Sequence, residues 1–135
     1  KKINLIDESY NSNPLSLEFA IRNFENIKVN PKYKNLLLGD MLELGKFSKK
    51  LHIESAKFIN RFKFNKLYII GKYIRYTFNK IQTQKKGKVL KNDKEIFDLF
   101  KNVLKNKDYI MVKGSNASGL NKIISIIKKE NLNAL

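Results

Sequence analysis

An apolar segment, a polar turn and an amphipathic stretch follow one another at the start of the chain, and this order constrains the fold most strongly. Residues 2–6 form a candidate strand. Pro14 then opens a stretch whose apolar side chains recur at helical spacing, at Leu17, Ala20, Ile21, Phe24 and Ile27. Asn13 is a favourable N-cap residue, and Pro14 suits the first helical position. A strand that leads into a helix through a polar turn is the repeating unit of a parallel α/β sheet.

The same alternation continues to the end of the chain. Further strands are expected at residues 35–39, 66–70, 88–90 and 108–112, and helices from 47, over 73–81, from 92 or 93, and from 120 to about 130. The pattern predicts a Rossmann-like, three-layer α/β/α fold with a mostly parallel sheet of five or six strands. A length of 135 residues suits a single domain, 1–135. Strand order, and whether an extra antiparallel strand completes the sheet, stay open.

Composition narrows the chemistry available to the chain. Hydrophobic residues make up 42% of the sequence, which favours a folded globule over disorder. The absence of cysteine excludes disulfides and thiolate metal sites, and the single histidine, His52, cannot alone build a histidine metal site, so we expect no bound metal. We interpret His52 as a packed helical residue rather than a catalytic base. The apolar runs are too short to span a bilayer, so we expect a cytoplasmic protein.

A net charge of +16 raises the alternative of a basic, Rossmann-like module that binds nucleic acid. The lysines are spread along the whole sequence, and arginine, the preferred residue for bidentate contacts, occurs only at Arg22, Arg61 and Arg75. We therefore expect neither nucleic acid nor a membrane as the partner, although the charge favours an anionic substrate.

Polar turns of unusual composition follow three of the expected strands, at residues 7–13, 40–43 and 113–118. Parallel strands end at the same edge of a sheet, where open α/β folds bind ligands, and a helix N-terminus favours anions. Neither a P-loop nor a GxGxxG fingerprint is present. The alternative is that these are ordinary connections, in which Asp7 and Asn13 only brace the first helix and Asp40 only binds backbone amides.

The three turns together resemble the C-terminal domain of the Mur ligase family. Residues 6–14, Ile-Asp-Glu-Ser-Tyr-Asn-Ser-Asn-Pro, are similar to the family's Asp-Asp-Ser-Tyr-Asn-Ala-Asn-Pro. Residues 39–45 are similar to its Gly-Asp-Met-x-Glu-Leu-Gly, with His52 at the expected distance, and residues 112–115 match its Val-Lys-Gly-Ser. The first two variants favour the member that joins D-alanyl-D-alanine to UDP-N-acetylmuramoyl-tripeptide in peptidoglycan precursor synthesis. Another Mur-type amino-acid ligase, or a non-catalytic homologue, is the alternative within the family.

The resemblance implies an enzyme that uses ATP and Mg²⁺ to activate the tripeptide carboxylate as an acyl phosphate, which the dipeptide amine then attacks. The domain that holds the UDP-sugar and the central ATPase domain have no counterpart in this sequence. We therefore interpret the chain as a fragment, inactive alone and without catalytic residues, that closes over its own central domain in a monomeric enzyme.

The resemblance also assigns site residues by position. The expected nucleotide-binding residues are Asp7, Glu8, Tyr10, Asn11 and Asn13. The expected substrate-binding residues are Asp40, Glu43, Lys113, Ser115 and Ser118. Glu8 stands where the family has an aspartate near the ribose. Asn116 stands where the family usually has arginine, which leaves the dipeptide carboxylate to Lys113 or Lys122.

Overall fold

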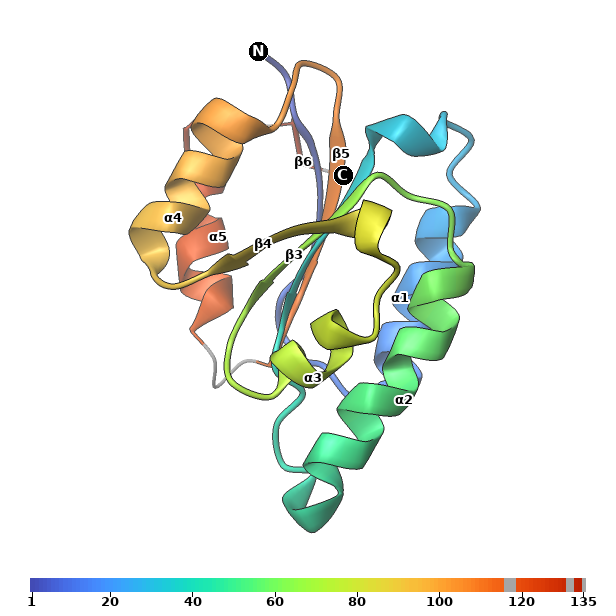
Figure 1. Cartoon of the computed structure of the whole chain (residues 1–135). Coiled ribbons are helices and arrows are strands. Elements are labelled where there is room, and N and C mark those ends of the chain that lie inside the picture. Colours follow the sequence, from blue (N-terminus) through green and yellow to red (C-terminus); the bar gives the residue numbers. More distant parts are fainter. Residues whose placement is uncertain (116–118, 131–132, 135) are drawn as a thin grey trace.

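The computed structural model describes residues 1–115, 119–130 and 133–134. Strands and helices alternate along the described chain, as the apolar periodicity predicts (Figure 1). The strands are β1 (Asn4–Glu8), β2 (Lys34–Gly39), β3 (Lys66–Ile70), β4 (Lys86–Leu90), β5 (Tyr109–Lys113) and β6 (Asn133–Ala134). The α-helices are α1 (Pro14–Glu25), α2 (Ser48–Arg61), α3 (Ile74–Asn79), α4 (Asp93–Asp98) and α5 (Leu120–Lys128).

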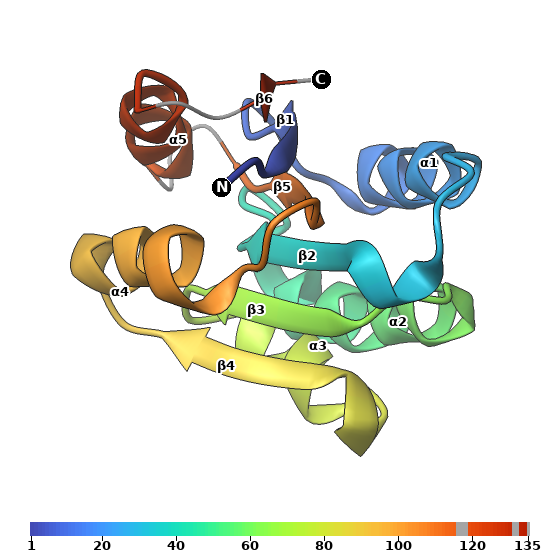
Figure 2. The same cartoon turned by 90° about the horizontal axis from the view of Figure 1, so that it is seen from above.

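The strands form one sheet in the order β4-β3-β2-β5-β1-β6, and every strand pair is parallel. Helices α1, α2 and α3 cover one face of this sheet, and α4 and α5 cover the other (Figure 2). The three-layer α/β/α prediction and the number of strands are confirmed. The strand left open in the sequence is β6, which pairs with β1 in the parallel direction.

The apolar core lies in two layers, one on each face of the sheet. Leu36, Leu38 and Met111 point to the face covered by α1 and α2, where they belong to one buried cluster with Phe24. Leu37 points to the opposite face and belongs to the cluster beneath α4 and α5. Successive side chains of a strand alternate between faces, so the three consecutive leucines of β2 serve both layers.

The central strands β1 and β5 end later than the sequence pattern predicts. The first strand was expected at residues 2–6 but occupies Asn4–Glu8, and the strand expected at 108–112 occupies Tyr109–Lys113. The cause is their pairing, because Asp7 lies beside Val112 and Glu8 beside Lys113 in the ladder. Charged residues at these ends look like turn residues in the sequence, although they are part of the sheet.

Asparagine side chains cap the N-termini of α1 and α4. The Asn13 side chain accepts a hydrogen bond from the Ser16 N–H at 2.8 Å, and Ser16 Oγ accepts from the Asn13 N–H at 3.1 Å, which completes a capping box at α1. Asn92 caps α4 by accepting from the Glu95 N–H at 3.0 Å. Helix α4 continues directly into a π-helical turn, Leu99–Val103. Among the described helices, none has the length and apolarity required to cross a membrane.

Candidate functional site

The polar turns after β1, β2 and β5 meet at one edge of the sheet, the lower edge in Figure 1. Lys113, at the end of β5, lies in register with Glu8 of β1 on one side and Leu38 of β2 on the other. Lys113 Nζ donates a hydrogen bond to the Asn11 carbonyl at 2.7 Å, and the Ser115 N–H donates to the Asp40 carbonyl at 3.2 Å. The predicted convergence of the three turns is confirmed.

The connections that leave this edge lead to helices on opposite faces of the sheet. The connections after β1 and β2 lead to α1 and α2 on one face, whereas the connection after the intervening strand β5 leads to α5 on the other (Figure 2). Neighbouring connections that diverge in this way leave a crevice at the carboxyl ends of the strands, which is the usual ligand position in open α/β sheets.

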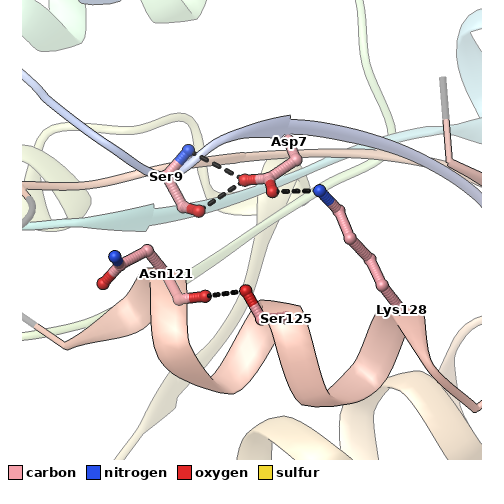
Figure 3. A network of polar contacts seen from close by, with 5 residues as sticks. All are labelled: Asp7, Ser9, Asn121, Ser125 and Lys128. Carbon is pink, nitrogen blue, oxygen red and sulfur yellow. Dashed lines mark hydrogen bonds and ion pairs between the residues drawn. The ribbon is translucent and has the colours of Figure 1, made fainter.

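The Asp7 carboxylate binds Lys128 of α5 (Figure 3). One oxygen pairs with Lys128 Nζ at 2.5 Å, and the other accepts from the Ser9 N–H at 3.0 Å and from the Ser9 hydroxyl. Burial raises the pKa of Asp7, but the hydrogen bonds from Lys128 and Ser9 outweigh it, so the pKa lies below its ordinary value. Asp7 is therefore an ionised brace between β1 and α5, and not a brace of α1.

The rest of the first turn divides into buried supports and exposed side chains. Ser9 and Ser12 are buried, and Asn13 is engaged as the N-cap of α1. The Tyr10 side chain is 63% exposed, and Asn11 is exposed beside it. Of the predicted nucleotide-binding residues, Tyr10 and Asn11 are thus the two whose side chains are presented at the surface of this edge.

Glu8 and Lys113 form a charged pair of strand ends beside a pocket. The pocket has a volume of about 380 Å³ and is bounded by the start of α1, through Asn13, Leu15 and Phe19. Lys113 is only 4% exposed, and burial lowers the pKa of its ammonium while the Glu8 charge partly restores it. A buried ammonium already bonded to the Asn11 carbonyl is poorly placed to bind a substrate carboxylate directly.

Asp40 holds the connection between β3 and α3. Its carboxylate accepts hydrogen bonds from the Ile74 N–H at 2.8 Å and from the Lys72 N–H at 3.1 Å. The interpretation that Asp40 binds backbone amides agrees with this geometry, although the amides belong to a neighbouring connection rather than to its own loop. A second pocket of about 190 Å³ lies beside Asp40, where Gly71 faces the starts of α4 and α5.

The remaining predicted substrate residues are placed differently. Glu43 is exposed and has a left-handed backbone, with φ of 63°. Ser115 is partly buried at the sheet edge. Lys122 is exposed near the start of α5. Ser118 and Asn116 lie outside the described residues.

His52 is buried inside α2 and bonded through both ring nitrogens. Nε2 accepts from the Met41 N–H at 3.0 Å, and Nδ1 donates to the Ser48 carbonyl at 2.7 Å. Burial lowers the pKa of His52, against smaller opposing effects of the Ser48 carbonyl and of Asp40. These contacts confirm that His52 is a packed, neutral residue, which links the loop after β2 to α2.

Two features of the edge escaped the sequence analysis. Leu15 and Phe19 are 71% and 64% exposed on one side of α1. Their spacing of four residues, outside the core stripe of Leu17 and Ile21, is a sequence signal that indicates this exposure. No local signal pairs Lys128 with Asp7, because the two residues come from opposite ends of the chain.

The described residues also limit what this edge can hold. Within them, no group of three or more histidine, cysteine, aspartate or glutamate side chains is arranged to bind a metal ion. Exposed amide and phenol groups, together with the Glu8 carboxylate, instead suit the hydroxyl groups of an organic ligand.

Fold and edge together define an α/β domain with three polar turns at one edge of a parallel sheet. The Mur ligase, glutamate ligase domain family matches residues 1–116, and the chain therefore belongs to this family. A UDP-N-acetylmuramoyl-tripeptide–D-alanyl-D-alanine ligase of Buchnera aphidicola from Acyrthosiphon pisum is 37% identical over 131 residues, covering 93% of this chain and 27% of the relative. An enzyme of the same name from Rickettsia prowazekii is 28% identical over 120 residues, covering 89% of this chain and 26% of that protein.

Solved structures agree on the fold. A MurF ligase from Thermotoga maritima in complex with ADP superposes with a TM-score of 0.64 at 24% identity, covering 90% of this chain and 27% of that chain. MurF from Acinetobacter baumannii superposes with a TM-score of 0.70 at 18% identity, covering 90% and 26%. The chain thus spans about a quarter of the length of the relatives it matches.

Proposed function

We propose that this chain is the C-terminal domain of an ATP-dependent ligase that joins D-alanyl-D-alanine to UDP-N-acetylmuramoyl-tripeptide. The observation that carries the proposal is that the three turns whose sequences resemble the family motifs meet at one edge of the sheet. Two hydrogen bonds join them, from Lys113 to Asn11 and from Ser115 to Asp40. The 37% identity to a ligase of that name supports the choice of substrates. The reaction belongs to cytoplasmic peptidoglycan precursor synthesis.

In this proposal the chain closes over a central ATPase domain of the same polypeptide. The tripeptide carboxylate takes the γ-phosphoryl group of ATP, forming an acyl phosphate and releasing ADP. The dipeptide amine then attacks the carbonyl carbon, and the amide forms as phosphate leaves and the amine loses a proton. Acyl phosphates hydrolyse, so a domain that excludes water and orients the amine increases the yield of amide. Closure of a domain over bound substrate is a common way to achieve both effects.

The nucleotide part of the proposed site consists of Glu8, Tyr10 and Asn11. In this proposal the Glu8 carboxylate accepts hydrogen bonds from ribose hydroxyls. The exposure of Tyr10 and Asn11 supports their contact with the rest of the nucleotide. Asp7 and Asn13 support this turn through α5 and α1. Mg²⁺ would be held by the central domain, since the described part of this chain offers no cluster of metal ligands.

For the dipeptide, we propose contacts at the same edge other than the Asp40 carboxylate and the Lys113 ammonium. The Asp40 carboxylate and the Lys113 ammonium are already bonded to backbone groups. Glu43, which is exposed, is the candidate for its ammonium. We assign the dipeptide carboxylate to Lys122, which is exposed near the N-terminal end of α5, where the helix dipole also favours an anion.

The proposal is tested with the complete polypeptide that contains this chain. Purified protein is incubated with ATP, Mg²⁺ and UDP-N-acetylmuramoyl-tripeptide, and product is measured by mass spectrometry with D-alanyl-D-alanine, D-glutamate or no amine acceptor. We expect the dipeptide adduct only, with stoichiometric ADP. Efficient use of D-glutamate instead would show that the protein is another Mur-type ligase. The absence of an adduct with any acceptor would contradict the ligase assignment.

A further inference from the structure

Lys113 combines a buried charge with a backbone partner at the candidate site. It is the last residue of β5, its side chain is 4% exposed, and its Nζ lies 2.7 Å from the Asn11 carbonyl oxygen. Asn11 lies in the turn after the neighbouring strand β1. One side chain therefore spans two of the three turns that form the edge.

The hydrogen bond between the Lys113 ammonium and the Asn11 carbonyl holds the backbone of the turn. Burying an ammonium is unfavourable unless strong hydrogen bonds compensate, and a hydrogen bond from a charged donor is stronger than one between neutral groups. The acceptor is the Asn11 main chain, so the bond fixes the path of the backbone and leaves the exposed Tyr10 and Asn11 side chains to face outward. Glu8, the register partner of Lys113, provides the nearby negative charge.

We propose that Lys113 is a positioning residue, whose ammonium fixes the turn of residues 9–13 on the sheet edge through the Asn11 carbonyl, and that it is not a ligand of the substrate carboxylate. The strand ladder that precedes this turn also links it to β5, through the pairing of Glu8 with Lys113. Fixing the backbone in advance lowers the entropy that a ligand must remove when it binds. Only this consequence for nucleotide affinity rests on the proposed function; the contact itself does not.

The structure supplies an internal comparison for this inference. The turn after β2 is attached to the chain beyond β5 by another bond, from the Ser115 N–H to the Asp40 carbonyl. Removing the Lys113 ammonium should therefore loosen residues 9–13 while leaving the Asp40 turn ordered. A general loss of stability would affect both turns alike.

Lys34 provides a matched control at the opposite edge. It is 3% exposed, and its Nζ donates to the carbonyls of Phe24 and Glu25, at 2.9 and 3.2 Å, at the end of α1. Lys34→Met and Lys113→Met each remove one buried ammonium and keep an apolar stem of similar length. They differ in the segment that the ammonium holds.

The test is ¹⁵N NMR relaxation of the unaltered chain and of the variants Lys113→Met, Lys34→Met and Lys113→Arg. Rigid backbone has an order parameter near 0.85 and flexible backbone below about 0.6. We expect Lys113→Met to lower the order parameters of residues 10–12 from about 0.85 to below about 0.6, with residues 40–42 and the Ser115 amide unchanged. Lys34→Met should leave residues 10–12 unchanged, and Lys113→Arg should restore part of their order.

Unchanged order at residues 10–12 in folded Lys113→Met, or an equal loss in Lys34→Met, would overturn the proposal. A second measurement needs no substitution. In the unaltered chain, the Lys113 Nζ protons should exchange slowly enough to give a ¹H–¹⁵N correlation with a cross-peak to the Asn11–Ser12 backbone. Rapid exchange without that cross-peak contradicts the contact even if Lys113→Met fails to fold. Failure of ligase activity alone leaves both NMR results intact.

Discussion

Asp7 and His52 are both poorly accessible to solvent, but their partners favour opposite charge states. Asp7 receives hydrogen bonds from Lys128 and Ser9, which stabilise a carboxylate. His52 accepts from one backbone N–H and donates to one backbone carbonyl, which requires a neutral ring with its proton on Nδ1. The charge state of each residue therefore follows from its local hydrogen bonds, and each can be measured separately.

The first prediction concerns His52, whose ring signals are unambiguous because it is the sole histidine. Its folded pKa lies below the ordinary value of 6.5 because the ring is buried. The unfolded chain therefore binds more protons below pH 6.5, so stability should decrease as the pH falls from 6.5 towards the folded pKa. Ring NMR shifts recorded against pH should give a midpoint below 6.5, and a midpoint above 6.5 would contradict the neutral, packed assignment.

The second prediction concerns Asp7→Asn. Because the folded pKa of Asp7 is lowered, its carboxylate contributes stability above its unfolded pKa, and this contribution disappears as the pH falls through the folded value. We expect the variant to lose about 1–2 kcal/mol in urea unfolding at pH 7, since its partner Lys128 is partly exposed.

Acid pH provides the control for this substitution. The difference between Asp7→Asn and the unaltered chain should shrink below about pH 4, where the carboxylate is protonated in the unfolded state. A stability difference that is the same at pH 7 and in acid would show that the ion pair with Lys128 is not its source.

At the scale of the elements, the loop after β3 is built around one glycine. Gly71 has φ of +137°, and a Cβ at this position would overlap the Asp40 carboxylate that holds the Lys72 and Ile74 amides. Gly45 also has positive φ, at +58°, but a Cβ there would meet no atom within 4 Å. An alanine at Gly45 would therefore suffer only backbone strain, whereas an alanine at Gly71 would also overlap the Asp40 side chain.

The third prediction follows from this pair. Gly45→Ala should cost about 1–2 kcal/mol of unfolding free energy, which is the cost of a left-handed backbone for an L-residue. Gly71→Ala should cost more, about 3 kcal/mol or above, because Asp40 must also leave the amides at the start of α3. Denaturant midpoints for both variants check this order, and equal costs would contradict the role assigned to Asp40.

How far the elements could be predicted depends on their local sequence. β3 lies at Lys66–Ile70 as expected, because its apolar run is followed by glycine. β1 was expected too early, because Asp7 and Glu8 look like turn residues although they pair with Val112 and Lys113. β6 has two residues and depends on its pairing with β1, which no periodicity reveals.

The candidate site shows the same division. Its convergence at one edge could be predicted, since parallel strands end together and three of them carry polar residues. The partners of individual side chains could not, because they come from distant segments. Asp40 binds amides that follow β3, Lys113 binds a carbonyl that follows β1, and Asp7 binds Lys128 of α5. These contacts indicate that Asp40, Lys113 and Asp7, which were predicted to bind ligands, instead hold neighbouring segments of the protein in place.

For the molecule as a whole, the net charge of +16 predicts weak attraction to any polyanion. The fourth prediction is that the chain binds double-stranded DNA without sequence preference, with a dissociation constant of about 10⁻⁶ M or weaker at physiological salt. Fluorescence anisotropy with two unrelated duplexes between 50 and 200 mM salt measures this. Sequence-selective binding that persists at 200 mM salt would favour the nucleic-acid-binding alternative.

The proposed function requires that the edge carrying Tyr10 contribute to a nucleotide site. Val103 is an exposed apolar residue in the π-helical turn after α4. The carbonyl of the next residue, Leu104, accepts a hydrogen bond from the Lys1 side chain, so Val103 lies at the N-terminal end of the sheet. Truncating it serves as the matched control, because it removes an exposed side chain far from the turn.

Steady-state kinetics of the complete ligase, with ATP varied, tests the claim most directly. A stacked aromatic contact to a nucleotide base is worth about 1–3 kcal/mol, so Tyr10→Ala should lower kcat/KM for ATP about 5- to 150-fold. Val103→Ala should leave kcat/KM for ATP unchanged. Wild-type kcat and KM in Tyr10→Ala would contradict the central claim that this edge faces the nucleotide.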